Sequence, residues 1–143
     1  IHHNQHTHPN FMNTTGISGS LVPPDHGDNS WLEICLQATD GDGLTGESCI
    51  EIFPQRSVYT FTTDPAGLQI IYEGAYYTTP FTAAIPVNTY RSVNAPLTQG
   101  ELSFTAWSDG GDAAHVIEID TPQTLVATFR QLTWLPLVLR GYP

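Results

Sequence analysis

The sequence predicts an all-β protein made of two tandem β-sandwich modules, of which the first is incomplete. Three observations predict this fold class. Apolar and polar residues alternate with period two in many short runs, turn signals rich in Gly, Pro, Asn and Asp separate the runs, and no useful stretch has a helical period. We expect a partial module at 1–54, a seven-stranded module at 57–131 and an apolar C-terminal tail at 132–143.

The composition of the chain limits the kinds of partner that it can bind and indicates the compartment in which it functions. The 143 residues include 14 Asp and Glu but only four Lys and Arg, for a formal net charge of −10. Such a charge repels phosphate backbones, which argues against nucleic-acid binding. No apolar run is long enough to span a bilayer, so we expect no transmembrane segment. The chain opens on Ile1 without the pattern of a signal peptide, so we expect a mature or excised piece of a longer secreted precursor.

The opening stretch concentrates the histidines of the chain. Four of the six histidines are His2, His3, His6 and His8. In a single extended strand alternate residues share a face, which groups His2, His6 and His8 and turns His3 away. Neighbours on one face lie about 6.6–7 Å apart, near enough for two imidazoles to chelate one ion.

A loop further along the chain holds the residues that would complete a metal site. If the loop folds back, the zinc- or copper-type set is completed by Asp25, His26 or Asp28. The predicted metal site is therefore His6 and His8 with His26 and Asp28, and the cation would be zinc, copper or calcium. The alternative is a polar edge strand, or an exposed terminus, whose imidazoles form only local hydrogen bonds.

The next segment predicts a β-hairpin with a disulfide. Trp31–Thr39 and Glu47–Ile52 alternate with period two, and Asp40–Gly43 between them is a strong turn signal. In a hairpin centred on Asp42 the opposed pairs are Leu32 with Ile52, Ile34 with Ile50 and Cys35 with Cys49. Directly opposed Cβ atoms lie about 4.5–5.5 Å apart, close enough for a disulfide after a small adjustment. A disulfide indicates an oxidising compartment.

Seven short strands are expected in the second module, and their alternation predicts its core. The strands are Val58–Thr62, Leu68–Tyr72, Tyr76–Ile85, Thr89–Ala95, Leu102–Trp107, His115–Ile119 and Leu125–Arg130. The expected core positions are Tyr59, Phe61, Leu68, Ile70, Phe81, Ala83, Ile85, Leu102, Phe104, Ala106, Ile117, Ile119, Leu125, Ala127 and Phe129. Asp40–Gly43 and Asp109–Asp112 lack the ligand pattern of a calcium loop and are interpreted as turns. The tail Leu132–Arg140 is apolar, and Pro136 confines it to an edge position, so we expect it to pack on another module or chain.

Two stretches resemble known bacterial modules. Trp31 to Pro54, with WLEICLQATDGDGLT running into CIEIFP, resembles the last hairpin of PKD-type immunoglobulin-like modules. The upstream HHNQHTHP and PPDHGD are similar to PKD-like modules attached to secreted bacterial glucose/sorbosone-dehydrogenase-type proteins. DPAGLQIIYEG, TTPFTA and FTAWSDGGDAAHVIEI resemble a second β-sandwich repeat with a Trp-Ser-Asp-Gly-Gly turn. The resemblance implies non-catalytic, immunoglobulin-like accessory modules, and an incomplete first module, because a full PKD-like sandwich has further strands before the His stretch.

The functional expectation follows from these features. No nucleophile elbow or Gly-rich phosphate loop is present, so we predict that the chain is not an enzyme. We expect a non-catalytic extracellular module for spacing, attachment or carbohydrate contact, in which Tyr72 and Tyr76 would stack on sugar rings. One alternative is a filament-like subunit that assembles with copies of itself by strand exchange, with the His stretch or the tail as donor. Another is a metal-binding module that uses the His cluster.

Overall fold

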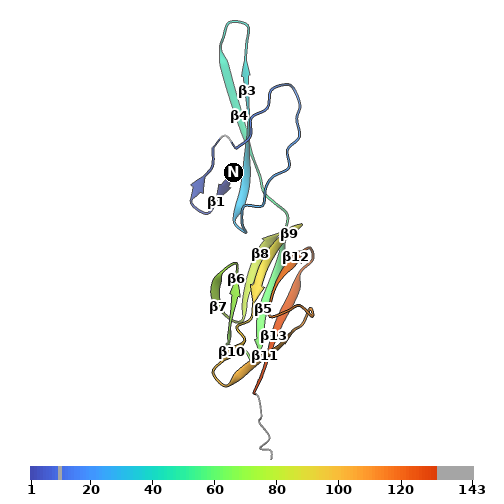
Figure 1. Ribbon diagram of the computed structural model, residues 1–143. Coiled ribbons are helices and arrows are strands. Elements are labelled where there is room, and N and C mark those ends of the chain that lie inside the picture. The colour runs from blue at the N-terminus through green and yellow to red at the C-terminus, as the bar shows by residue number, and fades with distance from the viewer. Residues whose placement is uncertain (10, 132–143) are drawn as a thin grey trace, which may run out of the picture. The chain divides into compact units, whose positions relative to one another are not determined.

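A computed structural model describes residues 1–9 and 11–131, and this part of the chain is all-β (Figure 1). The strands are β1 (His2–His3), β2 (His6–Thr7), β3 (Ser30–Thr39), β4 (Thr45–Ile52), β5 (Arg56–Asp64), β6 (Gln69–Tyr72), β7 (Ala75–Thr78), β8 (Phe81–Pro86), β9 (Thr89–Asn94), β10 (Thr98–Gln99), β11 (Leu102–Trp107), β12 (Ala114–Ile119) and β13 (Gln123–Gln131). The described residues include no helix that could cross a membrane. The predicted tail at 132–143 lies outside the described residues.

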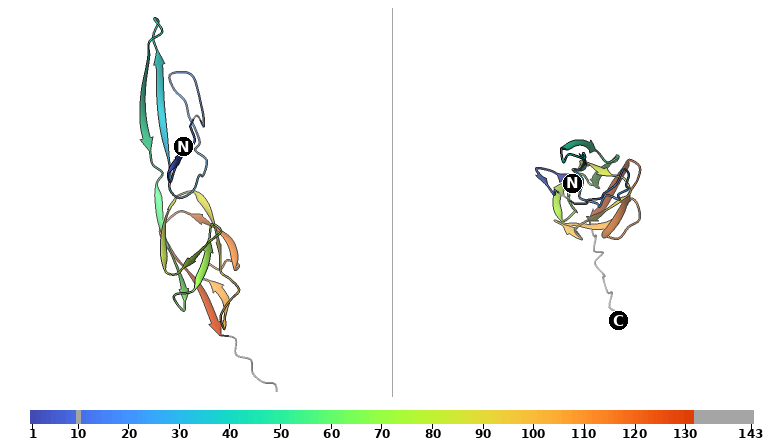
Figure 2. Two further views of the ribbon diagram at one scale, coloured as in Figure 1. Left: turned by 90° about the vertical axis from the view of Figure 1, so that its left-hand side faces the viewer. Right: turned by 90° about the horizontal axis from the view of Figure 1, so that it is seen from above.

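The chain divides into two compact units. The first comprises Ile1–Tyr59, Ala83–Thr89 and Glu118–Pro122, and the second comprises Thr60–Thr82, Tyr90–Ile117 and Gln123–Pro143. The first unit contains a four-stranded antiparallel sheet in the order β2-β1-β3-β4. The remaining strands form a five-stranded sheet in the order β10-β11-β13-β5-β8 and a four-stranded sheet in the order β12-β9-β6-β7 (Figures 1 and 2).

The register predicted for the first hairpin is confirmed. In the ladder of β3 and β4 the opposed pairs include Leu32 with Ile52, Ile34 with Ile50 and Cys35 with Cys49. Cys35 and Cys49 are joined by a disulfide, and their Cα atoms lie 4.0 Å apart. Two constraints agree on this register, because the same pairing collects the apolar side chains on one face and opposes the two sulfur atoms.

The burial predicted for this hairpin is wrong. Alternation suggested a half-buried strand, but Leu36 and Ile50 are 66% and 61% exposed, and every residue of β4 is exposed. The reason lies in the sheet, where β1 pairs with β3 at only two positions of the ladder and no strand of the described residues flanks the outer side of β4. Period-two alternation shows which face of a strand is apolar, whereas burial of that face needs a second layer.

The predicted core of the second module is largely confirmed. Tyr59, Phe61, Ile70, Ile85, Ile117, Ile119, Leu125, Ala127 and Phe129 are buried, together with Val93 and Trp107. The rings of Phe61 on β5 and Tyr72 on β6 lie 5.1 Å apart, which shows the two sheets packing face to face.

Two local predictions about strands of this module are wrong, and the first concerns the strand that contains Pro80. The expected strand Tyr76–Ile85 is broken before Phe81, where Pro80 supplies no N–H for a ladder.

The second difference is a register shift in the ladder between β11 and β13. The shift falls between Phe104 and Ala106, so the alternation changes phase and Trp107 is buried while Ala106 is exposed. An extra residue in one strand reverses the faces of all that follow. Sequence alternation alone places the wrong residue inside at this point.

The disulfide is expected to be the main stabiliser of the β3–β4 hairpin, since the hairpin buries little apolar surface. Replacing both cysteines by serine removes a cross-link over a separation of 14 residues, which in the chain-entropy model contributes about 3 kcal/mol. We expect amide hydrogen exchange from Glu33 to Glu51 to accelerate by about two orders of magnitude. Exchange within β5 and β13 serves as the internal control. Unchanged protection in β3 and β4 would show that packing, and not the disulfide, holds the hairpin.

Candidate metal centre

The histidine stretch folds into a tight hairpin. The chain reverses between β1 and β2, where Asn4 adopts a left-handed conformation with φ of 50°. His3 is thereby paired directly with His6 across the two strands, and directly opposed residues share a face. The prediction that His3 turns away from His6 and His8 is wrong, because it assumed one continuous strand where the structure has a turn.

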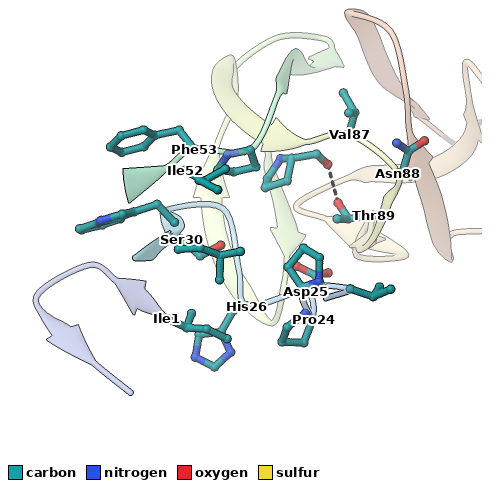
Figure 3. A pocket seen from close by; sticks show the side chains of 16 residues that line it. Ile1, Pro24, Asp25, His26, Ser30, Ile52, Phe53, Val87, Asn88 and Thr89 are labelled. Carbon is teal, nitrogen blue, oxygen red and sulfur yellow. Dashed lines mark hydrogen bonds between the residues drawn. The ribbon is translucent and has the colours of Figure 1, made fainter. Parts of the chain in front are cut away.

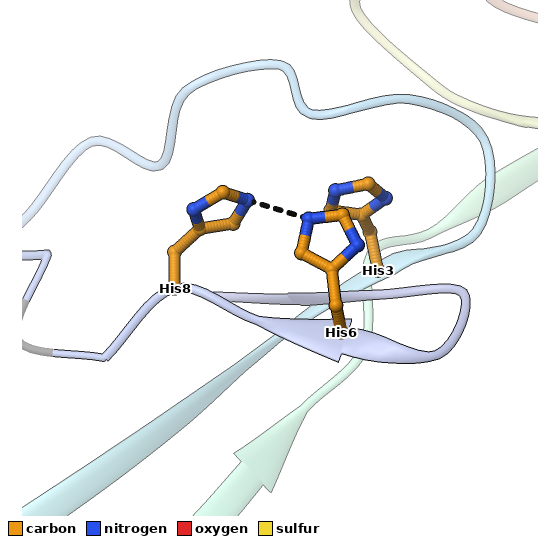
Figure 4. Close-up of side chains that lie close together, drawn as sticks. All are labelled: His3, His6 and His8. Atoms are coloured by element: carbon orange, nitrogen blue, oxygen red, sulfur yellow. Dashed lines mark hydrogen bonds between the residues drawn. The ribbon is translucent and has the colours of Figure 1, made fainter.

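Three imidazoles converge on one face of this hairpin (Figure 4). The ligand nitrogens of His3, His6 and His8 lie within 4.8 Å of one another. The Nε2 atoms of His6 and His8 are 3.0 Å apart and share a hydrogen bond. Two nitrogen ligands of a tetrahedral zinc ion, at about 2.0–2.1 Å from the metal, lie about 3.3–3.4 Å from each other. Small side-chain movements therefore suffice to convert this cluster into a three-nitrogen ligand set.

His26 joins the cluster from the loop that precedes β3. Its ring lies 4.7 Å from the ring of His3 and 4.7 Å from that of His8, centroid to centroid. The predicted fold-back of this loop therefore brings His26 to the cluster. Asp28, the other predicted loop ligand, does not belong to the group of converging ligand atoms.

His2 is separated from the cluster, although the strand argument grouped it with His6 and His8. Its ring stacks on Trp31 at 5.1 Å, and its Nε2 atom lies 3.0 Å from a carboxylate oxygen of Glu33. His2 is paired with Thr7 in the hairpin and with Trp31 in β3, so it occupies the opposite face from His3. It is a structural contact between β1 and β3.

Desolvation and neighbouring imidazoles lower the pKa values of two histidines of the cluster, His3 and His8. The pKa of His3 is lowered by partial desolvation and by repulsion from His6, His26 and His8. The pKa of His8 is lowered by partial desolvation and by repulsion from His26 and His6. Lowered pKa values keep the nitrogen lone pairs free at neutral pH, which is the state that a metal ion binds.

A second sulfur- and carboxylate-containing group is excluded as a metal site. Glu33, Cys35 and Cys49 place their ligand atoms close together. The two sulfur atoms are joined in a disulfide, however, and the sulfur ligand of metal ions is the free thiolate.

The acidic turns use their carboxylates for hydrogen bonds within the backbone, which confirms their interpretation as turns. Asp40 Oδ1 accepts hydrogen bonds from the N–H groups of Asp42 and Leu44. Asp109 accepts hydrogen bonds from the N–H of Gly111 and, through its other oxygen, contacts His115 Nε2 at 2.9 Å.

The predicted aromatic platform for carbohydrate is wrong. Tyr72 is buried, with 5% of its surface exposed, and its ring contacts those of Phe61, Tyr77 and Phe81. Tyr76 is 65% exposed, but a single exposed ring lacks the partner that stacking on a sugar chain was expected to use. The physical reason is that Tyr72 lies on the core face of β6.

A shallow cavity of about 470 Å³ lies within the first unit, beside the loop that carries His26 (Figure 3). Its lining is mainly apolar and includes Ile52, Phe53 and Pro54. The hydroxyl of Thr89 at its wall donates to the carbonyl of Pro86. The polar side chains of the lining include Asp25, His26 and Ser30, and the Ser30 hydroxyl donates to the carbonyl of Gly27. The His cluster is the candidate site because its ligand nitrogens converge.

Comparisons of this chain with known proteins found no similar protein. No family model matches the chain, and neither the curated proteins nor the solved structures give a significant match.

The lowered pKa values predict how the His cluster responds to acid. A histidine whose pKa is depressed by the fold contributes stability that is present above its ordinary value of about 6.5 and is lost as the pH falls below it. In the metal-free chain we expect the ring protons of His3 and His8 to titrate at lower pH than a histidine in a short peptide. Contacts between the His3 and His6 rings should disappear as these groups protonate. Proton NMR measures both, and titration at or above the ordinary value would contradict the geometry.

Proposed function

We propose that this chain is a non-catalytic module of a secreted protein and that its N-terminal hairpin binds a transition-metal ion. The observation that carries the proposal is the convergence of His3, His6 and His8, whose ligand nitrogens lie within 4.8 Å of one another. Three imidazoles whose nitrogens converge on one face of a two-stranded hairpin form a ligand set of the kind that transition-metal ions bind.

The ligand chemistry indicates which ions fit. Imidazole nitrogens suit Zn²⁺, Cu²⁺ and Ni²⁺, whereas Ca²⁺ requires six to eight oxygen ligands. Asp28, the acidic residue predicted as a ligand, is not among the converging groups. The proposed ion is therefore Zn²⁺ or Cu²⁺, and calcium is not proposed.

His26 determines what kind of metal site this is. Its ring contacts His3 and His8, so a change of side-chain rotamer would add a fourth nitrogen and close a tetrahedral shell. Structural zinc sites have four protein ligands, while catalytic ones keep a position open for water. The ion would then tie the loop at 11–29 that carries His26 to the β1–β2 hairpin, which supports a structural role in the module.

Secretion is supported by the hairpin that follows. The Cys35–Cys49 disulfide lies in two strands whose residues are mostly exposed. Reducing compartments would open an accessible cross-link of this kind, whereas extracellular conditions maintain it. The exposed disulfide and the imidazole-rich site together favour an extracellular module.

Metal titration of the chain tests the proposal directly. We expect one Zn²⁺ or Cu²⁺ per chain by isothermal calorimetry at pH 7.5, and weaker binding at pH 5.5 because protons compete for the nitrogens. Single substitutions His3→Gln, His6→Gln and His8→Gln should each weaken binding by about tenfold or more, since even the hydrogen-bond partners of metal ligands contribute about that much. His26→Gln should weaken binding and should also let a protease cleave the loop at 11–25 in the presence of metal, where the unsubstituted chain is protected.

Matched controls separate this site from other histidines and from the terminal amine. The first control is His2→Gln, because His2 lies on β1 beside His3 but outside the cluster. The second control is His115→Gln, because His115 lies on β12. Neither should change the affinity by more than about twofold. The chain is acetylated at its N-terminus so that the α-amine cannot act as a ligand. The absence of heat and of any thermal shift, or an equal loss in the His2 and cluster variants, would refute the proposed site.

A further inference from the structure

The outer edge of β4 is an unpaired strand edge with a defined pattern. Among residues 1–9 and 11–131, β4 is the terminal strand of the sheet β2-β1-β3-β4, and its eight residues have ladder partners on the β3 side only. We call the outer side of Thr45–Ile52 the open edge. Unpaired edges present rows of N–H and C=O groups to which another strand can add.

The hairpin turn determines which backbone groups face outward. Asp40 N–H donates to the carbonyl of Leu44 at 3.0 Å, so this pair is hydrogen-bonded and every second pair along the ladder is as well. Cys35 and Cys49 then form a non-hydrogen-bonded pair, in agreement with their short Cα separation of 4.0 Å. The residues of β4 whose N–H and C=O groups point to the open edge are Thr45, Glu47, Cys49 and Glu51.

Side chains along the open edge differ in character between the two faces of the hairpin. Ile50 and Ile52 are 61% and 43% exposed and lie on the apolar face. Glu47 and Glu51 lie on the other face with the disulfide, and Glu51 is directly opposite Glu33. Glu33 already contacts His2, and Glu51 accepts a hydrogen bond from Trp31 Nε1 at 3.2 Å, so the attraction of a cation to this face comes from the exposed carboxylates of Glu47 and Glu51 themselves.

The charge pattern argues against a second copy of this edge as the partner. Two open edges paired antiparallel about Cys49 would place Glu47 of each opposite Glu51 of the other. Residues 30–53 contain five acidic residues and no Lys or Arg, so no residue of the second hairpin would neutralise these contacts. Acidic side chains on an edge strand are a known protection against self-pairing.

We propose that the open edge of β4 accepts an extended segment of a different polypeptide, in which apolar residues alternate with Lys or Arg. The backbone of that segment pairs with the outward N–H and C=O groups of Glu47, Cys49 and Glu51. Its apolar side chains lie beside Ile50 and Ile52, and its basic side chains lie beside the two glutamates. Alternation places these two sets on opposite faces, as the hairpin requires.

Synthetic peptides test the pattern on the full chain with its disulfide intact. The probe is acetyl-Val-Lys-Val-Lys-Val-Lys-Val-amide. The first control peptide has the same composition in blocks, with three Lys followed by four Val, and the second replaces every Lys by Glu. We expect the alternating basic peptide to bind at least about tenfold more tightly than either control and to weaken with added NaCl. Amide NMR shifts in β4 locate the binding.

Three variants separate strand addition from simple charge attraction. Glu47→Gln with Glu51→Gln should weaken binding by about tenfold, and Glu118→Gln on β12 is the matched charge control with no expected effect. Glu47→Pro removes one glutamate charge and also an outward N–H that the hairpin does not use, so the hairpin should persist. Peptide binding should fall below that of the Glu47→Gln/Glu51→Gln variant, which lacks both charges but keeps the N–H. Circular dichroism and the intact disulfide check that this variant is folded.

Several outcomes would overturn the proposal. Equal binding of the block peptide would show attraction by charge alone, and unchanged binding to Glu47→Pro would exclude the open edge. If the alternating peptide did not bind at millimolar concentration, the proposed binding site would be refuted. A dimer of the chain whose contacts map to β4 would identify a second copy as the occupant and contradict the charge argument. None of these results depends on metal binding at the His cluster.

Discussion

The hydrogen bonds of the Asp40 carboxylate set the register on which the first unit depends. Oδ1 of Asp40 accepts from the N–H groups of Asp42 and Leu44 at 3.0 and 2.9 Å and holds the turn between β3 and β4. A slip of one residue would move each side chain of a strand to the opposite face. The disulfide, the apolar face and the outward backbone groups of the open edge all follow from this one register.

The two units stabilise the same kind of strand in different ways. In the strands from β5 onward, alternating apolar residues such as Phe61 and Phe129 are buried between two sheets. In the β3–β4 hairpin the corresponding residues stay exposed, and a two-stranded ribbon alone is marginal in water. The Cys35–Cys49 disulfide supplies part of what a small core cannot, and the proposed ion and the proposed added strand would stabilise the first unit further.

The His cluster and the open edge both present groups that attract positive charge. The ligand nitrogens of His3, His6 and His8 lie within 4.8 Å of one another, and residues 30–53 beside them contain five acidic residues and no Lys or Arg. Among these carboxylates, Glu33 is paired with His2. A cation at the first site and basic side chains at the second would each be attracted by these groups.

The sequence by itself determined the fold class, the strands of the second unit and the disulfide, because these rest on local alternation and on turn chemistry. Its alternation identified Ile34 and Ile50 as one face but could not show that no second layer covers them. Only the tertiary structure decided which histidines form the cluster proposed to bind metal, since the turn at Asn4 moves His3 to the face of His6 and the loop brings His26 from a distance. It also decided against the sugar platform by burying Tyr72. Contacts between residues far apart in the chain depend on packing, which no local pattern encodes.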